Sequence, residues 1–267
     1  MPRFSLLTLN SFGLPFFVAW RRLPRLMREL HRHSASVICL QEIQQNSYLP
    51  LVMRGLSGYR HFAFHPNRFA PKGGLLTASR LALESSRFSL YHNRGRWLSV
   101  TFGDRFLGKG MLATHLRIGG RRLAVVNTHL NANYSGDWSP NNSFARIQRE
   151  QVAQLAAWAR AQPEDVLVVV GGDFNFPRGS FLYDELLATS GLTDPLANDP
   201  RPTYRPFSVI PSKWALPIDF VFIRVPPRLN VSVKADIITI EDTCAPIVRR
   251  RFLTDHCALT LVLTWPA

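Results

Sequence analysis

Short apolar runs rich in β-forming residues recur along the whole chain, and they restrict its fold more than any other feature. These runs cover residues 3–9, 36–41, 59–64, 73–79, 96–102, 111–117, 122–130, 165–170, 217–224, 229–240 and 256–264. Helical apolar spacing occurs at about 20–32, 143–161 and 179–189. About eleven strands exceed what one small sheet uses, whereas two sheets packed face to face under outer helices can bury them. We therefore expect one α+β sandwich domain over residues 1–267.

The charge of the chain is strongly positive. Lys and Arg number 32 against 18 Asp and Glu, which gives a formal net charge of +14. The hydrophobic content of 46% excludes a disordered polyelectrolyte and is sufficient to fill a core. Such a charge indicates an anionic partner, which could be nucleic acid, a phosphorylated substrate or an acidic membrane surface.

The cysteines and the N-terminal segment limit the protein class further. The three cysteines have no CxxC spacing, which argues against a disulfide framework or a zinc cluster. The segment MPRFSLLTLN alternates like a strand and lacks the order of a signal peptide. The apolar stretch 11–20 contains Gly13 and Pro15 and is too short to span a bilayer. We expect a cytoplasmic or peripheral membrane protein without a transmembrane helix.

Polar residues of catalytically useful types end or begin several of the predicted strands. They are Asn10, Glu42, His129, Asn131, Asp173, Asn175, Asp219, Asp255 and His256. Carboxylate and amide oxygens suit a hard divalent cation, and histidine suits proton transfer at neutral pH. The set therefore predicts an oxygen-ligated metal site with histidine assistance. Because clustered cysteines and histidines are scarce, magnesium is favoured over zinc, and Mn²⁺ is an alternative.

Each of these residues also has a purely structural interpretation. Asn10 could cap a turn, Asp173 could form an Asx turn after two glycines, and His129 could be a satisfied core histidine. Glu42 and Asp219 adjoin strongly apolar strands, where a buried carboxylate needs a cation or hydrogen-bonding partner. The functional interpretation rests on the whole set.

The ordered blocks of the chain resemble the endonuclease/exonuclease/phosphatase superfamily, which includes deoxyribonucleases, abasic-site endonucleases, inositol polyphosphate phosphatases and neutral sphingomyelinases. The blocks are Asn10, QEI at 41–43, NTHLNA at 127–132, GGDFN at 171–175, IDFVF at 218–222 and TDH at 254–256. The resemblance implies a deoxyribonuclease-like fold, a four-layer α-β-β-α sandwich of two mixed sheets forming a single catalytic domain. SFGLP after Asn10, the pair Lys109–Gly110 and THLNA are similar to the neutral sphingomyelinase branch.

The resemblance also implies ligands for a metal and for the substrate. Glu42 is the first candidate metal ligand, with Asn10 beside it, and Asp255 is a further candidate. One or two ions are compatible with this set. Asn131 and Lys109 are the candidate substrate-binding residues.

Five residues are candidate catalytic groups: His129, Asp173, Asn175, Asp219 and His256. The family pattern places Asp173 and Asn175 where they orient the attacking water. Asp219 would hold His256 in a carboxylate–imidazole pair, and His129 would donate to the phosphoryl oxygen or the leaving group. Either Asp173 or His256 could be the general base.

The favoured function is a magnesium-dependent phosphodiesterase that acts as a sphingomyelinase-like phospholipase C. Its substrate would be a phosphodiester, with phospholipid favoured and nucleic acid as the alternative, so that a DNA or RNA endonuclease or exonuclease is the rival function. A non-catalytic phosphate- or lipid-binding module is a second alternative. No obligate protein partner is evident from the sequence.

Three segments outside the predicted active site have two interpretations each. Residues 12–20 are interpreted as core packing, with peripheral membrane contact as the alternative hypothesis. The loop 133–143 is interpreted as a solvated connection, with substrate selection as the alternative. The arginines at 249–251 could form a solvated face or attract phosphate.

Overall fold

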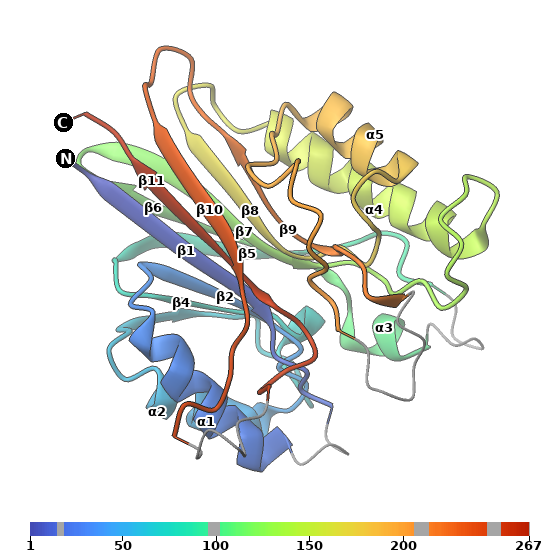
Figure 1. Ribbon diagram of the computed structural model, residues 1–267, viewed down its shortest axis with the longest axis horizontal. Coiled ribbons are helices and arrows are strands. Elements are labelled where there is room, and N and C mark those ends of the chain that lie inside the picture. Colours follow the sequence, from blue (N-terminus) through green and yellow to red (C-terminus); the bar gives the residue numbers. More distant parts are fainter. Residues whose placement is uncertain (15–18, 96–101, 206–213, 245–251, 267) are drawn as a thin grey trace.

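The strands of the computed structural model form two mixed sheets (Figure 1). The structure describes residues 1–14, 19–95, 102–205, 214–244 and 252–266. The six-stranded sheet has the order β10-β11-β1-β2-β4-β3, and the five-stranded sheet has the order β5-β6-β7-β8-β9. In chain order the strands are β1 (Arg3–Asn10), β2 (Val37–Gln41), β3 (His61–Ala63), β4 (Leu76–Ser79), β5 (Leu83–Leu90), β6 (Gly110–Ile118), β7 (Arg121–His129), β8 (Leu167–Asp173), β9 (Asp219–Arg224), β10 (Ser232–Ile238) and β11 (Ala258–Thr264).

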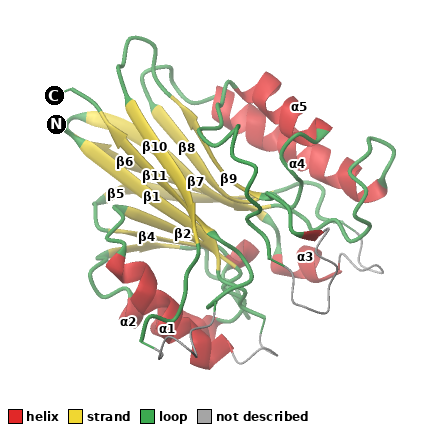
Figure 2. Cartoon of the chain, in the orientation of Figure 1, coloured by secondary structure: helices red, strands yellow, loops and turns green. Residues whose placement is uncertain are grey.

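Helices cover the outer face of each sheet, so the expected α-β-β-α layering is confirmed (Figure 2). Helices α1 (Ala19–Arg32) and α2 (Leu49–Gly55) pack on the six-stranded sheet. Helices α4 (Ser143–Arg160) and α5 (Phe181–Ser190) pack on the five-stranded sheet. The short α3 (Phe102–Leu107) precedes β6, and two 3₁₀ turns occupy Asn46–Tyr48 (η2) and Lys72–Gly74 (η3).

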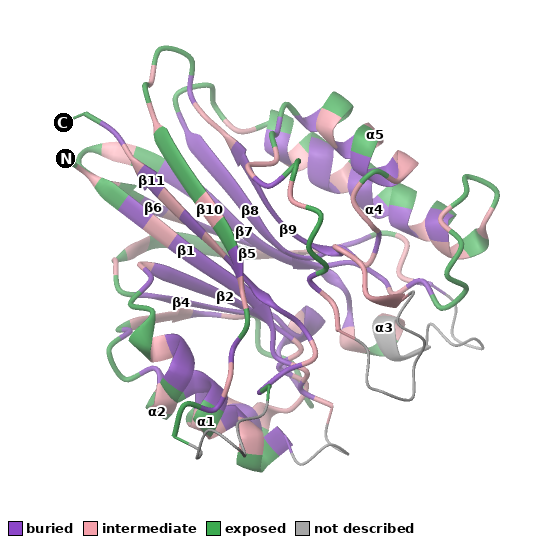
Figure 3. Cartoon of the chain, viewed as in Figure 1, coloured by how far each residue is buried: buried purple, intermediate pink, exposed green. Residues whose placement is uncertain are grey.

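The apolar core has three parts because successive strand residues face opposite sides of a sheet. On β1, Leu6 faces the other sheet, whereas Leu7 and Leu9 face the helices. On β8, Val169 faces the other sheet, whereas Val168 faces α4 and α5. The strands that are buried on both faces read as continuous apolar runs, and Figure 3 shows their burial in purple.

Helix α4 owes its start to a local cap. The Asn142 side-chain oxygen accepts hydrogen bonds from the backbone N–H groups of Phe144 and Ala145 at 2.9 and 3.3 Å. These bonds satisfy two of the four amide groups that the first turn leaves unpaired. The cap fixes where the loop 133–143 ends and the helix begins.

The strand pairing brings the predicted site residues to one end of the sandwich. In the parallel pair β1–β2, Asn10 lies opposite Gln41, the residue before Glu42. In the parallel pair β7–β8, His129 lies opposite Asp173, which lies opposite Asp219 on β9. The carboxyl ends of parallel strands meet at one edge, so residues far apart in the sequence become neighbours.

Several predicted elements need correction. Strand β5 was not predicted because its sequence, LESSRFSL, is largely polar, and α2 was not predicted because it is only seven residues long. The predicted strand at 73–79 begins only at Leu76, since Gly73 and Gly74 have positive φ angles in η3. The predicted strand 96–102 falls on residues 96–101, outside the described residues, and on residue 102, which begins α3.

None of the helices that the structure describes is both long enough and apolar enough to cross a membrane.

Candidate active site

A cavity of about 430 Å³ opens where the ends of β1, β2, β7, β8 and β9 converge. One part of its wall is polar and contains nearly all of the residues predicted for the site: Asn10, Glu42, Lys109, His129, Asp173, Asn175, Asp255 and His256. The remainder is apolar and aromatic, with Phe12, Leu14, Leu107, Tyr134, Trp138, Tyr204 and Trp214 among its members. The cavity can therefore bind the polar reacting group of a substrate to its polar residues and a non-polar part of the same substrate to its apolar and aromatic residues.

Glu42 lies in a strained turn directly after β2. Its φ angle is +61°, a left-handed conformation that is uncommon for a residue with a side chain. Two glycines enclose the turn: a methyl group at Gly13 would overlap the Glu42 carbonyl oxygen, and one at Gly74 would lie 3.3 Å from the Glu42 Cα. Such strain persists only where the surroundings hold it, and it is common at functional sites.

The Glu42 carboxylate has one occupied and one unoccupied oxygen. Asn10 Nδ2 donates to Glu42 Oε1 at 3.0 Å and to Asp173 Oδ2 at 2.9 Å, so one amide joins two acidic groups. The buried Glu42 Oε2 has no hydrogen-bond partner. An unpaired buried carboxylate oxygen is costly, and a divalent cation would satisfy it. The site therefore fits a metal ion held by Glu42 beside Asn10, and Asp255 supplies a further carboxylate to the same cavity.

His256 is held from behind by a carboxylate. Asp219 Oδ2 lies 2.8 Å from His256 Nδ1 and also accepts a hydrogen bond from Thr203 Oγ1 at 2.6 Å. The pair fixes the imidazole ring and leaves its Nε2 facing Asp173, whose Oδ2 is 3.8 Å away. Asp173, Asp219 and His256 are close enough to share a metal. Because Asp219 and His256 bind each other, we interpret them as a hydrogen-bonded pair.

Asp173 occupies the centre of the polar wall. Its Oδ2 accepts from Asn10 and lies 3.4 Å from His129 Nε2, while its Oδ1 accepts the Asn175 backbone N–H at 3.0 Å. Asn175 has a φ angle of +55° and its side-chain amide donates to the Leu130 carbonyl at 3.0 Å. The ends of β1, β7 and β8 therefore meet at one carboxylate.

Burial and neighbouring charges separate the pKa values of these groups. Burial, followed by the Asp219 carboxylate, raises the pKa of Asp173 to about 7. Burial and the Lys109 ammonium hold the pKa of His129 well below its usual value, so this imidazole is neutral. Burial lowers the pKa of His256, but the Asp219 carboxylate outweighs it and the net result lies well above the usual value. The site thus combines a carboxyl group whose pKa lies near 7 with a protonated imidazole.

The sequence as a whole matches a known family. The model of the Endonuclease/Exonuclease/phosphatase family matches residues 7–256. The chain belongs to that family. A putative neutral sphingomyelinase of Drosophila melanogaster is 25% identical over 240 residues, which cover 86% of this chain and 54% of the fly protein. The chain therefore spans about half the length of this relative.

Solved structures share the fold of this family member. A beta toxin variant from Staphylococcus aureus with bound magnesium ions superposes with a TM-score of 0.73 at 15% identity, covering 96% of this chain and 98% of the toxin chain. D. rerio TDP2 complexed with a single-strand DNA product gives a TM-score of 0.71 at 16% identity, covering 98% and 99% of the two chains. At these identities the likeness establishes the two-sheet architecture.

Two of the predicted substrate-binding residues lie in different places. Lys109 is 2% exposed and lines the cavity. Asn131 lies outside the cavity lining: its amide donates to the Arg94 carbonyl at 3.1 Å and accepts from Gln151 Nε2 at 2.5 Å. Asn131 therefore supports the segment that follows His129, and its direct contact with substrate stays a prediction.

The loop 133–143 is more than a solvated connection. Asn133, Tyr134 and Trp138 line the cavity, although Tyr134 is 52% exposed. The loop is fastened to the site because Trp138 Nε1 donates to the Asn175 carbonyl at 3.0 Å. A methyl group at Gly136 would lie 2.9 Å from the Trp214 ring, so the loop also packs closely on that side chain. The loop 133–143 therefore forms part of the cavity wall, and this replaces its interpretation as a solvated connection.

Two other sequence interpretations fall partly or wholly outside the described residues. In the segment 12–20, residues 15–18 are not described, Phe12 and Leu14 line the cavity, and Trp20 is 55% exposed with the Arg21 guanidinium 4.5 Å from its ring centroid. The arginines at 249–251 lie outside the described residues.

Sequence reasoning missed several residues that shape the site. Thr203 fixes Asp219, Tyr204 lies with its ring 5.1 Å from that of His256, and Trp214 completes the aromatic wall. These residues come from the long connection between α5 and β9, which has no periodic pattern. Gln148 of α4 was not missed in this way, because its place at the start of the predicted helix 143–161 suggests that it orients the loop 133–143. It donates to the carbonyl groups of Asn131 and Asn175 at 2.8 Å.

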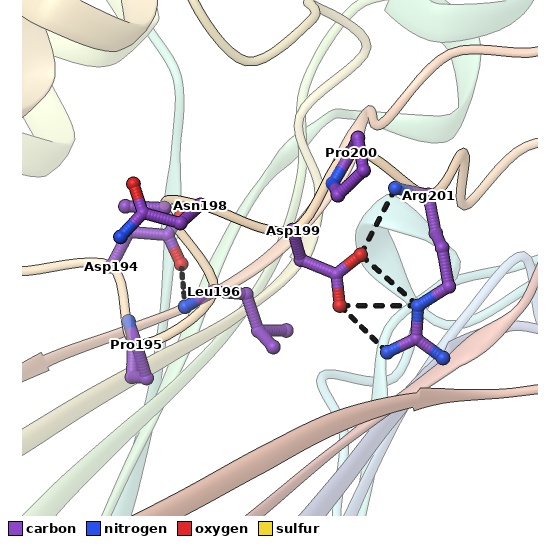
Figure 4. A pocket seen from close by; sticks show the side chains of 8 residues that line it. Asp194, Pro195, Leu196, Asn198, Asp199, Pro200 and Arg201 are labelled. Atoms are coloured by element: carbon purple, nitrogen blue, oxygen red, sulfur yellow. Dashed lines mark hydrogen bonds and ion pairs between the residues drawn. The ribbon is translucent and has the colours of Figure 1, made fainter.

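A second hollow of about 570 Å³ lies along residues 194–201 (Figure 4). Its carboxylates are occupied by protein groups: Asp199 binds the Arg201 guanidinium, and Asp194 binds Arg178 at 3.0 Å and the Leu196 N–H at 2.8 Å. None of its lining residues lines the cavity described above. We assign it no part in the chemistry.

Proposed function

We propose that this family member is a divalent-metal-dependent phosphodiesterase that cleaves a phospholipid by attack of water on phosphorus, as a sphingomyelinase-like phospholipase C. One observation carries the proposal: the Asp219-held His256 lies 3.8 Å from Asp173 in the wall of a cavity that Glu42 also lines, and Glu42 has an unpaired carboxylate oxygen. A proton donor, a base and a metal ligand thus meet around space for one phosphate group.

The metal-binding residues would be Glu42, with Asn10 beside it, and Asp255. Magnesium suits their oxygen donors, and the beta toxin structure that shares this fold contains magnesium ions. When bound, the ion would neutralise charge that builds up on the phosphoryl oxygens. The amide of Asn10 donates to both Glu42 and Asp173, so it links the proposed metal ligand to the carboxylate beside it.

Asp173 would be the general base. Its pKa of about 7 leaves much of it ionised at neutral pH, yet makes it basic enough to take a proton from water. Asn175, whose N–H already holds Asp173 Oδ1, would orient the same water from the cavity wall. The water oxygen forms the new P–O bond and its proton passes to Asp173.

His256 would supply the proton for the departing alcohol. Asp219 stabilises the imidazolium and holds Nδ1, so the proton on Nε2 is the one that faces the cavity. The P–O bond to the alcohol breaks as this proton is transferred. His129, neutral and beside Lys109, would donate a hydrogen bond to a phosphoryl oxygen, and Lys109 would attract the phosphate charge.

The choice of a phospholipid rests on two supports. The Drosophila relative that matches most of this chain is a putative neutral sphingomyelinase. The cavity lining also includes Tyr134, Trp138, Trp214 and aliphatic side chains, which suit a quaternary ammonium headgroup or the first part of a lipid. The net charge of +14 favours a nuclease as the second candidate, because a zwitterionic headgroup requires much less positive charge.

A substrate panel tests the proposal. Sphingomyelin vesicles, abasic DNA, plasmid DNA and inositol phosphates would each be incubated with the protein, with magnesium or with chelator. We expect magnesium-dependent release of phosphocholine from the vesicles and little cleavage of DNA. Cleavage of DNA that falls steeply with salt, without phosphocholine release, would establish the nuclease instead.

A further inference from the structure

Arg22 of α1 binds three backbone carbonyl groups that belong to two other segments. Its Nη1 donates to the Ser11 carbonyl at 2.7 Å and to the Leu253 carbonyl at 2.5 Å, and its Nη2 donates to the Phe12 carbonyl. The guanidinium carbon also lies 5.3 Å from the centroid of the Phe12 ring. One side chain therefore joins the residues after β1 to the loop before β11.

Both joined segments carry residues of the cavity. Ser11 follows Asn10 directly, and its N–H and Oγ donate to the Gln41 carbonyl at 3.1 and 2.8 Å, next to Glu42. Leu253 precedes Thr254, whose Oγ1 donates to the Asn10 carbonyl at 2.8 Å. The guanidinium thus lies behind the turns that present the metal-binding residues and the loop that leads to His256.

Only an arginine can make this set of contacts. Its planar fork offers several N–H donors in fixed directions, whereas a lysine offers one ammonium group. Burial lowers the pKa of Arg22, and the carboxylates of Asp255 and Glu42 counteract that effect, so the guanidinium remains charged behind the acidic wall. Hydrogen bonds from a charged donor to carbonyl groups are stronger than neutral ones.

We propose that Arg22 is a positioning residue: it holds the turn after Asn10 and the loop 252–256 in the arrangement that the reaction requires, without touching substrate. The activity part of this inference rests on the proposed phosphodiesterase function. Arg22 lies outside the cavity lining, so its effect is expected on turnover and not on substrate affinity. A displacement of about 1 Å in a catalytic group costs roughly 100-fold in rate.

Arg22→Met and Arg22→Lys test the proposal, with Arg25→Met as the matched control. Arg25 lies on the same helix, is exposed and pairs with Asp242 at 3.3 Å, away from the cavity. With bis-(p-nitrophenyl) phosphate as a soluble substrate, we expect kcat to fall about 10- to 100-fold in Arg22→Met and less in Arg22→Lys, with KM changed less than about threefold. Arg25→Met should match the parent protein.

Amide hydrogen exchange provides a readout that needs no activity. We expect faster exchange in peptides covering 10–14 and 252–257 in both Arg22 variants, and unchanged exchange in Arg25→Met. Unchanged exchange in Arg22→Met, or a rise in KM at constant kcat, would overturn the positioning role. If Arg22→Met fails to fold, Arg22→Lys decides by the same criteria. Failure of the parent protein to cleave any diester would instead refute the proposed function and leave the exchange result to judge Arg22.

Discussion

At the scale of single residues, this site is an arrangement of charges that the backbone enforces. Glu42 adopts a left-handed conformation and keeps an unpaired oxygen, while Asn10 divides its amide between two carboxylates. Asp219 raises the pKa of His256 and, together with burial, that of Asp173. The same carboxylate therefore shifts the pKa of both the proposed acid and the proposed base.

Replacing the proposed metal ligand Glu42 should raise the metal requirement. Glu42→Gln keeps the size of the side chain but removes its negative charge, so its remaining oxygen binds Mg²⁺ weakly. Even outer partners of metal ligands change affinity by about 10- to 100-fold, and we expect at least that increase in the magnesium concentration for half-maximal activity. Titration of activity with magnesium measures it. An unchanged titration curve would remove Glu42 from the metal site.

Asp219→Asn should alter both the rate and its dependence on pH. Without the Asp219 carboxylate the pKa of His256 falls, so the imidazolium is lost at lower pH. We expect the alkaline limb of the kcat/KM profile to move to lower pH, and kcat to fall by roughly 10²- to 10⁴-fold. We expect the acid limb, which would follow protonation of Asp173, at or below about pH 7 in the parent protein, because burial raises the pKa of Asp173 to about 7 and a bound cation would favour the carboxylate. An alkaline limb that does not move would separate His256 from the proton transfer.

At the scale of elements, strand order and turn geometry bring the site together. The ends of β1, β2, β7 and β8 were predictable, because each apolar run stops at a polar residue. The layering was also predictable, because about eleven strands exceed what one small sheet uses, and the structure shows Leu6 and Leu7 on β1 packed on opposite faces. What the sequence could not predict was the path of the loops and the contacts of single side chains: Thr203 and Trp214 reach the site from an irregular connection, and Arg22 of α1 binds the segments behind it through tertiary contacts that leave no pattern in the chain.

A methyl group at Gly13 should disturb the site through the Glu42 turn. The added carbon would overlap the Glu42 carbonyl oxygen, and such overpacking costs about 1–3 kcal/mol of folding free energy. We expect Gly13→Ala to lower activity more than its stability loss explains. The control is Gly120→Ala, in the β6–β7 turn with φ +77° and no atom within 4 Å of the added carbon, which should lose stability and keep its activity. Chemical denaturation and kinetics on the same samples compare the two, and equal activity losses would contradict the expectation.

At the scale of the whole molecule, two sheets each contribute half of the site. Asn10, Glu42 and His256 come from the ends of the six-stranded sheet, and His129, Asp173 and Asp219 come from the five-stranded sheet. Asn127 links them in the core, since its amide on β7 donates to the carbonyl groups of Leu40 and Leu76 at 3.0 Å. The net charge of +14 adds long-range attraction for an anionic group to this rigid frame.

The central prediction for this site is that water attacks the phosphorus atom of the substrate. The most direct measurement is hydrolysis of sphingomyelin vesicles in ¹⁸O-labelled water with magnesium, followed by mass spectrometry of both products. Attack on phosphorus predicts one ¹⁸O atom in the released phosphocholine and none in the ceramide, with no product when chelator is present or His256 is replaced by alanine. Label in the ceramide, or undiminished release in chelator, would contradict the account.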